Sequence, residues 1–126
     1  MNEDVRKIVY QQLITLSLPV HYEIAPDDAI LPYIVYSFPT DGRKYKNQTV
    51  SDLQVDIYDA ERNDYNVARE IDSLINEVEG LLDYKSFFQG GSSFWFKRTT
   101  RQAIPFPEDS NIWARQLVFE TRIYRS

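Results

Sequence analysis

Two stretches of the chain place apolar residues at the three-to-four-residue spacing of a helix. The first runs from Glu3 to Ser17 and predicts an amphipathic helix with one buried stripe and Asn2 as its N-cap. The second runs from Asp64 to Tyr84 and carries the longest stripe, with Asn63 or Asp64 as its N-cap. These two segments are the predicted helices.

Runs of β type fill most of the remaining chain. Residues 20–24 and 33–38 are short, and residues 50–59 alternate between apolar and polar side chains. The alternation places Leu53, Val55 and Ile57 on one face of a strand and polar side chains on the other. That pattern is typical of a strand with one buried and one solvated face. Two further runs, 94–100 and 112–124, follow a predicted turn at Gly90-Gly91.

The predicted order of elements is α-β-β-β-α-β-β. Two amphipathic helices can cover one face of a mainly antiparallel sheet, which is a two-layer α+β arrangement. A length of 126 residues suits a single domain. The chain has no internal repeat, low-complexity tract or linker. We therefore expect residues 1–126 to form one α+β domain with both helices packed on the same face of the sheet.

Residues 40–47 form the first candidate contact loop. They hold Asp41-Gly42, a pair that favours a tight turn, and predict a hairpin with a long, basic and exposed tip. Cations interleaved with an aromatic ring suit contact with a protein or, as a weaker indication, with nucleic acid. The candidate interface residues of this tip are Arg43, Lys44, Tyr45 and Lys46.

The second candidate contact loop is the proline-braced segment 102–111. It presents two apolar residues, Ile104 and Phe106, on an irregular stretch of chain. Exposed apolar groups on loops mark contacts with other proteins, so both residues are candidate interface residues. The opposite interpretation, in which Phe106 folds back beneath the loop, fits the sequence equally well.

Charge is distributed unevenly along the chain. The net charge is −5, but residues 1–84 hold 16 acids and 7 bases (net −9), whereas residues 85–126 hold 3 acids and 7 bases (net +4). An acidic and a basic face on one subunit could steer head-to-tail contact between copies, with Arg98 and Arg101 as candidate interface residues. Alternatively, the two regions neutralise each other within one subunit. The acidic balance argues against tight DNA binding.

The residues needed for catalysis are scarce. The chain has no Cys, which removes disulfides, thiolate chemistry and zinc–thiolate sites, and its single histidine is His21. A lone histidine on a strand is far more often structural than a general base. The carboxylates match no calcium loop, and the Gly90-Gly91 stretch does not have the Gly-Lys-Ser/Thr ending of a phosphate loop. We expect no enzyme, no catalytic residues, no cofactor and no metal.

The chain also offers no feature that predicts a membrane location. No run approaches the roughly 18 apolar residues of a membrane helix, and the acidic N-terminal residues are unlike a signal peptide. We expect a protein made in the cytoplasm.

The succession of these elements is similar to a known family. A starting helix, the segment Leu31-Pro32-Tyr33 before a β run, the aspartates Asp56 and Asp59 near a strand end, a long amphipathic helix and a terminal strand pair follow one another over nearly the whole chain. This order and length resemble the tail-completion proteins, also called tail-terminator or head–tail joining proteins, of long-tailed bacteriophages and prophages.

The resemblance implies an assembly function. It implies a structural protein made in the host bacterial cytoplasm that forms a ring, commonly a homo-hexamer, in the virion at the tail–head interface. The partners it implies are further copies of the chain, the tail tube protein and the head connector protein, with DNA only as passing cargo. It is also compatible with a monomer in solution. Two alternatives stay open: another neck component, such as an adaptor or stopper, and a small nucleic-acid-binding module.

Overall fold

The computed structural model describes residues 3–40 and 42–125, and of residues 108 and 125 the backbone alone. Asn2, the expected cap of the first helix, and Asp41, part of the expected turn, lie outside these residues. The elements are, in chain order, α1 (Glu3–Leu13), the 3-10 helix η1 (Ile14–Leu16), β1 (Val20–Tyr22), β2 (Tyr33–Ser37), β3 (Arg43–Lys44), β4 (Gln48–Ala60), α2 (Val67–Leu82), β5 (Ser86–Gln89), β6 (Ser92–Ile104), the 3-10 helix η2 (Glu108–Ser110) and β7 (Ile112–Arg125).

The seven strands form one sheet in the order β1-β2-β4-β7-β6-β5, with β3 paired to β4. All neighbours are antiparallel except β1 and β2, which run parallel. The predicted α+β class and mainly antiparallel sheet are confirmed. The short strands β3 and β5 were not expected and extend the order to α-β-β-β-β-α-β-β-β.

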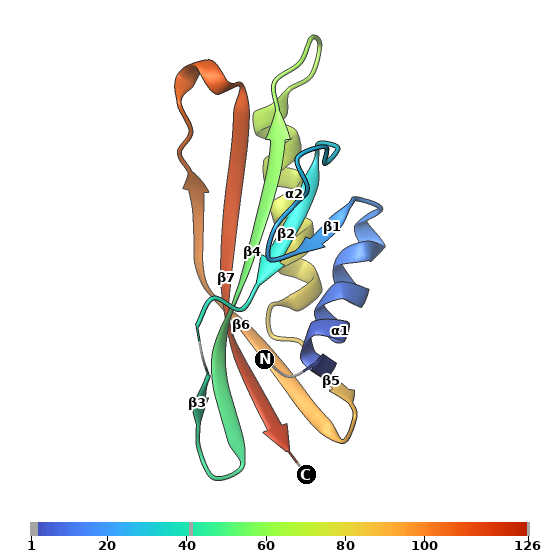
Figure 1. Cartoon of the computed structure of the whole chain (residues 1–126), viewed down its shortest axis with the longest axis vertical. Coiled ribbons are helices and arrows are strands. Elements are labelled where there is room, and N and C mark those ends of the chain that lie inside the picture. The colour runs from blue at the N-terminus through green and yellow to red at the C-terminus, as the bar shows by residue number, and fades with distance from the viewer. Residues whose placement is uncertain (1–2, 41, 126) are drawn as a thin grey trace.

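Long strands give the molecule its elongated shape. β4 pairs with β7 along all 13 of its residues, and β6 pairs with β7 from Ser92 to Ile104, with a register shift between Arg98 and Thr100. Such a shift marks a β-bulge, which bends and twists its strand. In Figure 1 the strands cross near the middle of the molecule, so that β4 and β6 exchange sides between its upper and lower ends. The two ends of the sheet therefore face different directions.

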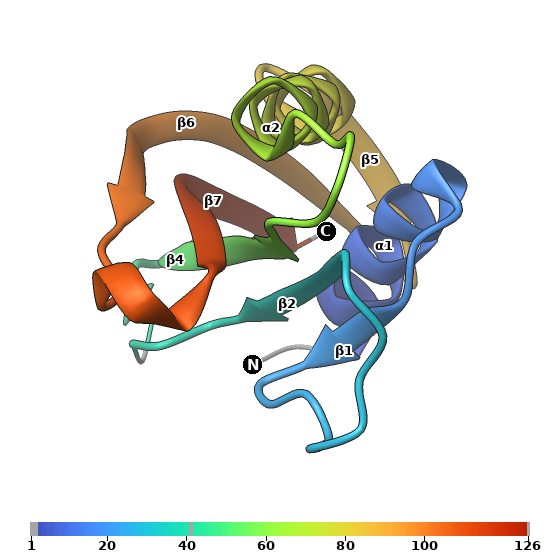
Figure 2. The same cartoon turned by 90° about the horizontal axis from the view of Figure 1, so that it is seen from above.

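Both helices cover one side of this sheet, as expected. Ile71, Ile75 and Val78 of α2 are fully buried and belong to one core cluster with Leu53 and Val55 of β4. Helix α1 adds residues to the same cluster and lies beside α2, while the sheet curls past them (Figure 2). The other members of the core are mainly aromatic and aliphatic residues of β6 and β7, among them Phe94, Phe96, Leu117 and Phe119.

The ends of the helices differ from the sequence prediction. α2 begins three residues later than expected, because its N-cap is Asn66, whose side chain accepts a hydrogen bond of 3.1 Å from the Arg69 backbone N–H. Neither Asn63 nor Asp64 caps it. α1 ends at Leu13 and is followed by a 3-10 turn up to Leu16. The single helix predicted for this segment is therefore an α-helix followed by a 3-10 turn.

The hairpin predicted for residues 40–47 forms, but its tight turn lies further along the chain. The Tyr45 N–H donates a hydrogen bond of 2.7 Å to the Gln48 carbonyl, which places Lys46 and Asn47 at the turn. Arg43 and Lys44 pair with β4 as strand β3. By contrast, Gly90-Gly91 makes the expected turn, with φ of +61° and +78°, values that glycine adopts without strain.

Candidate protein–protein interface

The side of the sheet opposite the helices has a hydrogen-bonded polar middle and carries aromatic side chains toward both ends. In the middle, Asp56 is nearly buried and accepts hydrogen bonds from Gln116 Nε2 (3.0 Å) and from Gln54 Nε2 (2.9 Å). The Gln102 Nε2 donates in turn to Gln116 Oε1 at 2.6 Å. The side-chain amides and the Asp56 carboxylate of the middle of this face therefore form one hydrogen-bonded chain.

The upper end of this face, as drawn in Figure 1, contains a recess of about 460 Å³ that is lined by aromatic and aliphatic side chains together with Glu23 and Asp27. Its floor is aromatic: the Tyr58 ring lies between Tyr33, at 5.2 Å between centroids, and Phe106, at 6.2 Å and edge-on. Burial, followed by the charge of Asp56, raises the pKa of Tyr58 above its ordinary value. The loop between β1 and β2 completes the recess, with the exposed Ile24 on its rim.

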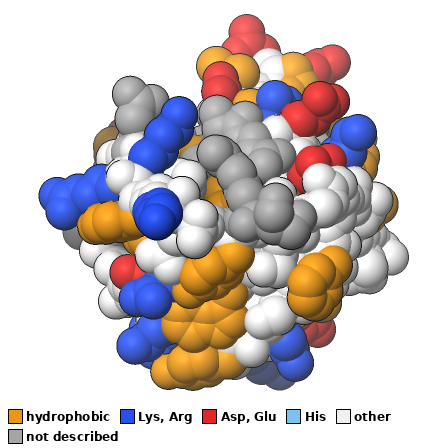
Figure 3. All heavy atoms as spheres, turned by 90° about the horizontal axis from the view of Figure 1, so that it is seen from below, with side chains coloured by type: hydrophobic (Ala, Val, Ile, Leu, Met, Phe, Trp, Pro, Cys, Tyr) orange, Lys and Arg blue, Asp and Glu red, His pale blue; other side chains and the backbone are white. Residues whose placement is uncertain are grey.

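The lower end of the same face carries exposed aromatic side chains. Phe88 of β5 is 83% exposed, and it lines a second recess of about 350 Å³ together with Trp95, Arg122 and Tyr124. The Arg122 guanidinium lies 5.5 Å from the centre of a Trp95 ring. Figure 3 looks at the molecule from this end and shows a contiguous group of hydrophobic side chains there. Aromatic residues and arginine are the side chains that protein interfaces favour.

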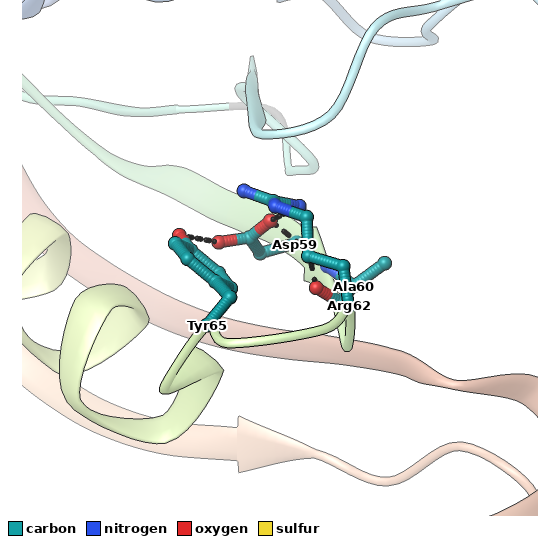
Figure 4. Close-up of polar contacts among 4 residues, drawn as sticks. All are labelled: Asp59, Ala60, Arg62 and Tyr65. Atoms are coloured by element: carbon teal, nitrogen blue, oxygen red, sulfur yellow. Dashed lines mark hydrogen bonds and ion pairs between the residues drawn. The ribbon is translucent and has the colours of Figure 1, made fainter.

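A hydrogen-bonded cluster around the buried Asp59 lies where β4 leads into α2 (Figure 4). Asp59 has no solvent exposure; its Oδ1 accepts from the Ala60 N–H (2.9 Å) and Arg62 Nη1 (3.1 Å), and its Oδ2 from Tyr65 Oη (2.6 Å). The Arg62 guanidinium stacks 3.7 Å above the Tyr65 ring. Burial and the hydrogen bond to Asp59 raise the pKa of Tyr65 to about 12. Since the carboxylate is covered and fully paired, this cluster holds the connection in place.

Arg98 and Arg101 lie on the helix side of β6. Both form ion pairs with Glu79 of α2, and the Arg101 Nη1 lies 3.5 Å from the Glu79 Oε2. Arg115 of β7 pairs in the same way with Asp72 of α2, at 3.0 Å. Acids of the first part of the chain are thus neutralised by bases of the second part within one subunit at these positions.

The predicted interface residues do not form one site. Ile104 and Phe106 lie at the upper end, where Phe106 both contacts Tyr58 and stays 39% exposed, so it takes a position between the two expected ones. Lys46 and the other tip residues are exposed on the β3–β4 hairpin at the lower end. The interface role of these residues stays a prediction.

Sequence reasoning missed Phe88 and the aromatic groups beside it. Phe87 and Phe88 are neighbours on a strand, so one of the two had to point away from the core. That signal was present in the sequence. The pairing of Trp95 with Arg122, which completes the surface, joins residues far apart in the chain and left no local trace.

The described residues show no assembled chemical centre. His21 packs edge-on to Tyr33 with 5.7 Å between ring centroids, and it does not line either recess. Within residues 3–40 and 42–125, no group of three or more His, Asp or Glu side chains could hold a metal ion. In the same part of the chain, none of the helices has the length and apolar character needed to cross a membrane.

Comparisons with known proteins identify the fold. No protein-family model matches the chain, and no curated protein matches it in sequence. Among solved structures, the chain is similar to a protein in the virion of a native gene transfer agent particle, with a TM-score of 0.73, 17% identity, and coverage of 96% of this chain and 95% of that one. A second solved structure has a TM-score of 0.64 at 12% identity, covering 100% and 98%. The fold is therefore shared from end to end with a virion component.

Proposed function

We propose that this chain is a virion structural protein that acts by assembling with other virion proteins and does not catalyse a reaction. The observation that carries the proposal is the match with a chain of a gene transfer agent virion, which covers 96% of this chain and 95% of that one. The surface supports it, because the aromatic groups are exposed at the two ends of the sheet, where another protein can reach them.

The more specific proposal is the one that the family resemblance implies. In it, the protein caps the tail tube and joins the tail to the head connector, as a ring of six copies at the tail–head interface. A closed ring needs two different, complementary patches on each subunit, and the two ends of the sheet supply candidates. Six copies at −5 each carry a charge of −30, which would ease the passage of DNA through the ring by repelling its phosphates.

Removing the gene from the particle that encodes it tests this proposal. Electron microscopy of the resulting particles is expected to show tails of irregular length or tails unattached to heads, and the normal form should return when the gene is supplied again. An adaptor or stopper function would leave tails of normal length with a defect on the head side. Normal, complete particles, or purified particles that do not contain the protein, would contradict a virion function.

Nucleic-acid binding is the second candidate, because the basic residues of the β3–β4 hairpin are exposed. A gel-shift assay with double-stranded DNA over a range of salt concentrations separates the two functions. A nucleic-acid module would bind with a steep salt dependence. A virion structural protein with the charge of this chain is expected to show no shift at physiological salt.

A further inference from the structure

We propose that two copies of this chain join head to tail by inserting Phe88 of one copy into the recess with an aromatic floor at the upper end of the next. The inference deepens the proposed function and rests on it, because it names the contact through which copies of the protein would assemble. It is argued from the way Phe88 is held, from the lining of the recess, from charge and from the direction of the two surfaces.

Phe88 is directed outward by the paired hairpin of β5 and β6. The register Gln89↔Ser92 closes the two-residue Gly90-Gly91 turn, and Phe87 packs inward against Phe96 at 5.9 Å between ring centroids. Strand alternation then directs Phe88 to the opposite side, where it is largely exposed. Because strand pairing already orders the backbone at Phe88, binding would restrict mainly the rotamers of its side chain.

The upper recess offers a phenyl ring an aromatic floor, with Glu23 and Asp27 also among the lining residues. Tyr33, Tyr58 and Phe106 present aromatic faces and edges, and Pro26 and Leu31 add aliphatic surface. Aromatic rings attract one another in tilted and edge-to-face arrangements of the kind already present between Tyr58 and Phe106. The volume of about 460 Å³ leaves room for a further aromatic side chain.

The two chain segments that carry these surfaces differ in charge, although Asp4 of α1 also lies against the Gly90 turn. Residues 84–97, which contain Phe88, include Lys85 and Lys97 and no acid. Residues 20–38, which form one side of the recess, include Glu23, Asp27 and Asp28 and no Lys or Arg. This complementarity favours contact between the two different ends. A symmetric contact of Phe88 with Phe88 would instead bring the lysines of both copies together.

The direction of the two surfaces favours a chain or ring of copies. The crossing of the long strands turns the upper and lower ends of the sheet to different directions (Figure 1). One copy therefore cannot fill its own recess with its own Phe88. A contact between two different patches leaves one of each unused on every pair, so further copies can add until the ring closes.

Engineered disulfides test this contact, since the chain has no cysteine of its own. Ser86→Cys places a thiol beside Phe88 and leaves the phenyl ring in place, and Ile24→Cys places one on the rim of the recess. The two full-length single variants, mixed at high concentration and oxidised, are expected to form a cross-linked pair. Phe88→Ala, added to the Ser86→Cys variant, is expected to lower the yield of the cross-linked pair about tenfold, the change produced by loss of a central aromatic contact.

Tyr10→Cys is the matched control, because Tyr10 is an exposed residue of α1 outside both surfaces. Mixing it with Ser86→Cys gives the background yield. Two results would overturn the inference. One is cross-linking of Ser86→Cys with itself above that background. The other is a yield of the Ser86→Cys and Ile24→Cys pair that stays at the background in both the purified chain and assembled particles. If the protein is in the particles but the cross-link is absent, the inference alone fails. If the cross-link forms and the particles do not contain the protein, the proposed virion function alone fails.

Discussion

The Tyr65 hydroxyl donates a 2.6 Å hydrogen bond to Asp59 Oδ2, and this bond joins the end of β4 to the residue before the N-cap of α2. Asp59 has no contact with solvent, so its charge depends on the donors that the chain provides. The position at which α2 begins is thus coupled to the C-terminal end of β4. Nothing in the helical periodicity predicted this coupling.

Removing the Tyr65 hydroxyl should destabilise the fold. In Tyr65→Phe the buried carboxylate loses one of its donors, and the expected cost is about 1–3 kcal/mol in the free energy of unfolding measured with urea. Tyr45→Phe makes the same chemical change at the exposed hairpin tip and should alter stability by less than about 0.5 kcal/mol. Equal effects of the two substitutions would show that the bond to Asp59 contributes nothing.

The same hydroxyl predicts a pH dependence in alkaline solution. Folding raises the pKa of Tyr65 from 10.0 to about 12, so between these values the folded chain holds a proton that the unfolded chain has lost. The stability contributed by this group is therefore complete below pH 10 and is lost as the pH rises toward 12. The difference in unfolding free energy between the unsubstituted chain and Tyr65→Phe should shrink over this interval. A constant difference would be evidence against the raised pKa.

The buried stripe of α2 should dominate stability. Ile75 is fully buried against the sheet, and Ile75→Ala is expected to cost about 2–5 kcal/mol through lost apolar burial and the cavity left behind. Asn76→Ala, one residue later on the exposed side, should change stability by less than about 0.5 kcal/mol. Chemical denaturation followed by circular dichroism measures both. A small effect of Ile75→Ala would mean that α2 does not pack as described.

The N-cap of α2 makes a smaller contribution that can be tested separately. Asn66→Ala removes the oxygen that accepts from the Arg69 N–H and should cost about 1 kcal/mol. Asn66→Asp keeps an acceptor and adds a negative charge at the helix N-terminus, so it should be neutral or slightly stabilising. If Asp and Ala have the same effect, the cap is not the cause.

Reversing the charges of Arg98 and Arg101 should weaken oligomerisation measured by light scattering, if these residues make contacts between copies. Both already pair with Glu79 of their own chain, so the reversal also places three negative charges together. Glu79→Gln provides the control, because it removes the internal partner and leaves both guanidinium groups. Its cost should stay within about 1 kcal/mol at this partly exposed position. An oligomer unaffected by the reversal would confine these arginines to a role within one subunit.

Local periodicity predicted the elements that carry it strongly. The stripe of α2 and the alternation of β4 each repeat over many residues, so the pattern alone distinguishes helix from strand and identifies the buried side. It predicted less well where a tertiary contact competes with it. The expected start of α2 was wrong because the segment before Asn66 is held by its hydrogen bond to Asp59. The hairpin turn lies at Lys46-Asn47 because the strand pairing with β4 continues through Lys44.

For this protein the sequence by itself determined the two helices, the central strand, the α+β class and the scarcity of catalytic groups, because these follow from residue type and short-range spacing. Only the tertiary structure decided which of Phe87 and Phe88 is exposed, which carboxylate Arg98 and Arg101 meet, and where the aromatic surfaces lie. Alternation specifies which side chains share a face of a strand. Which face the helices cover depends on the register between strands that are distant in the chain, and that register is a property of the whole sheet.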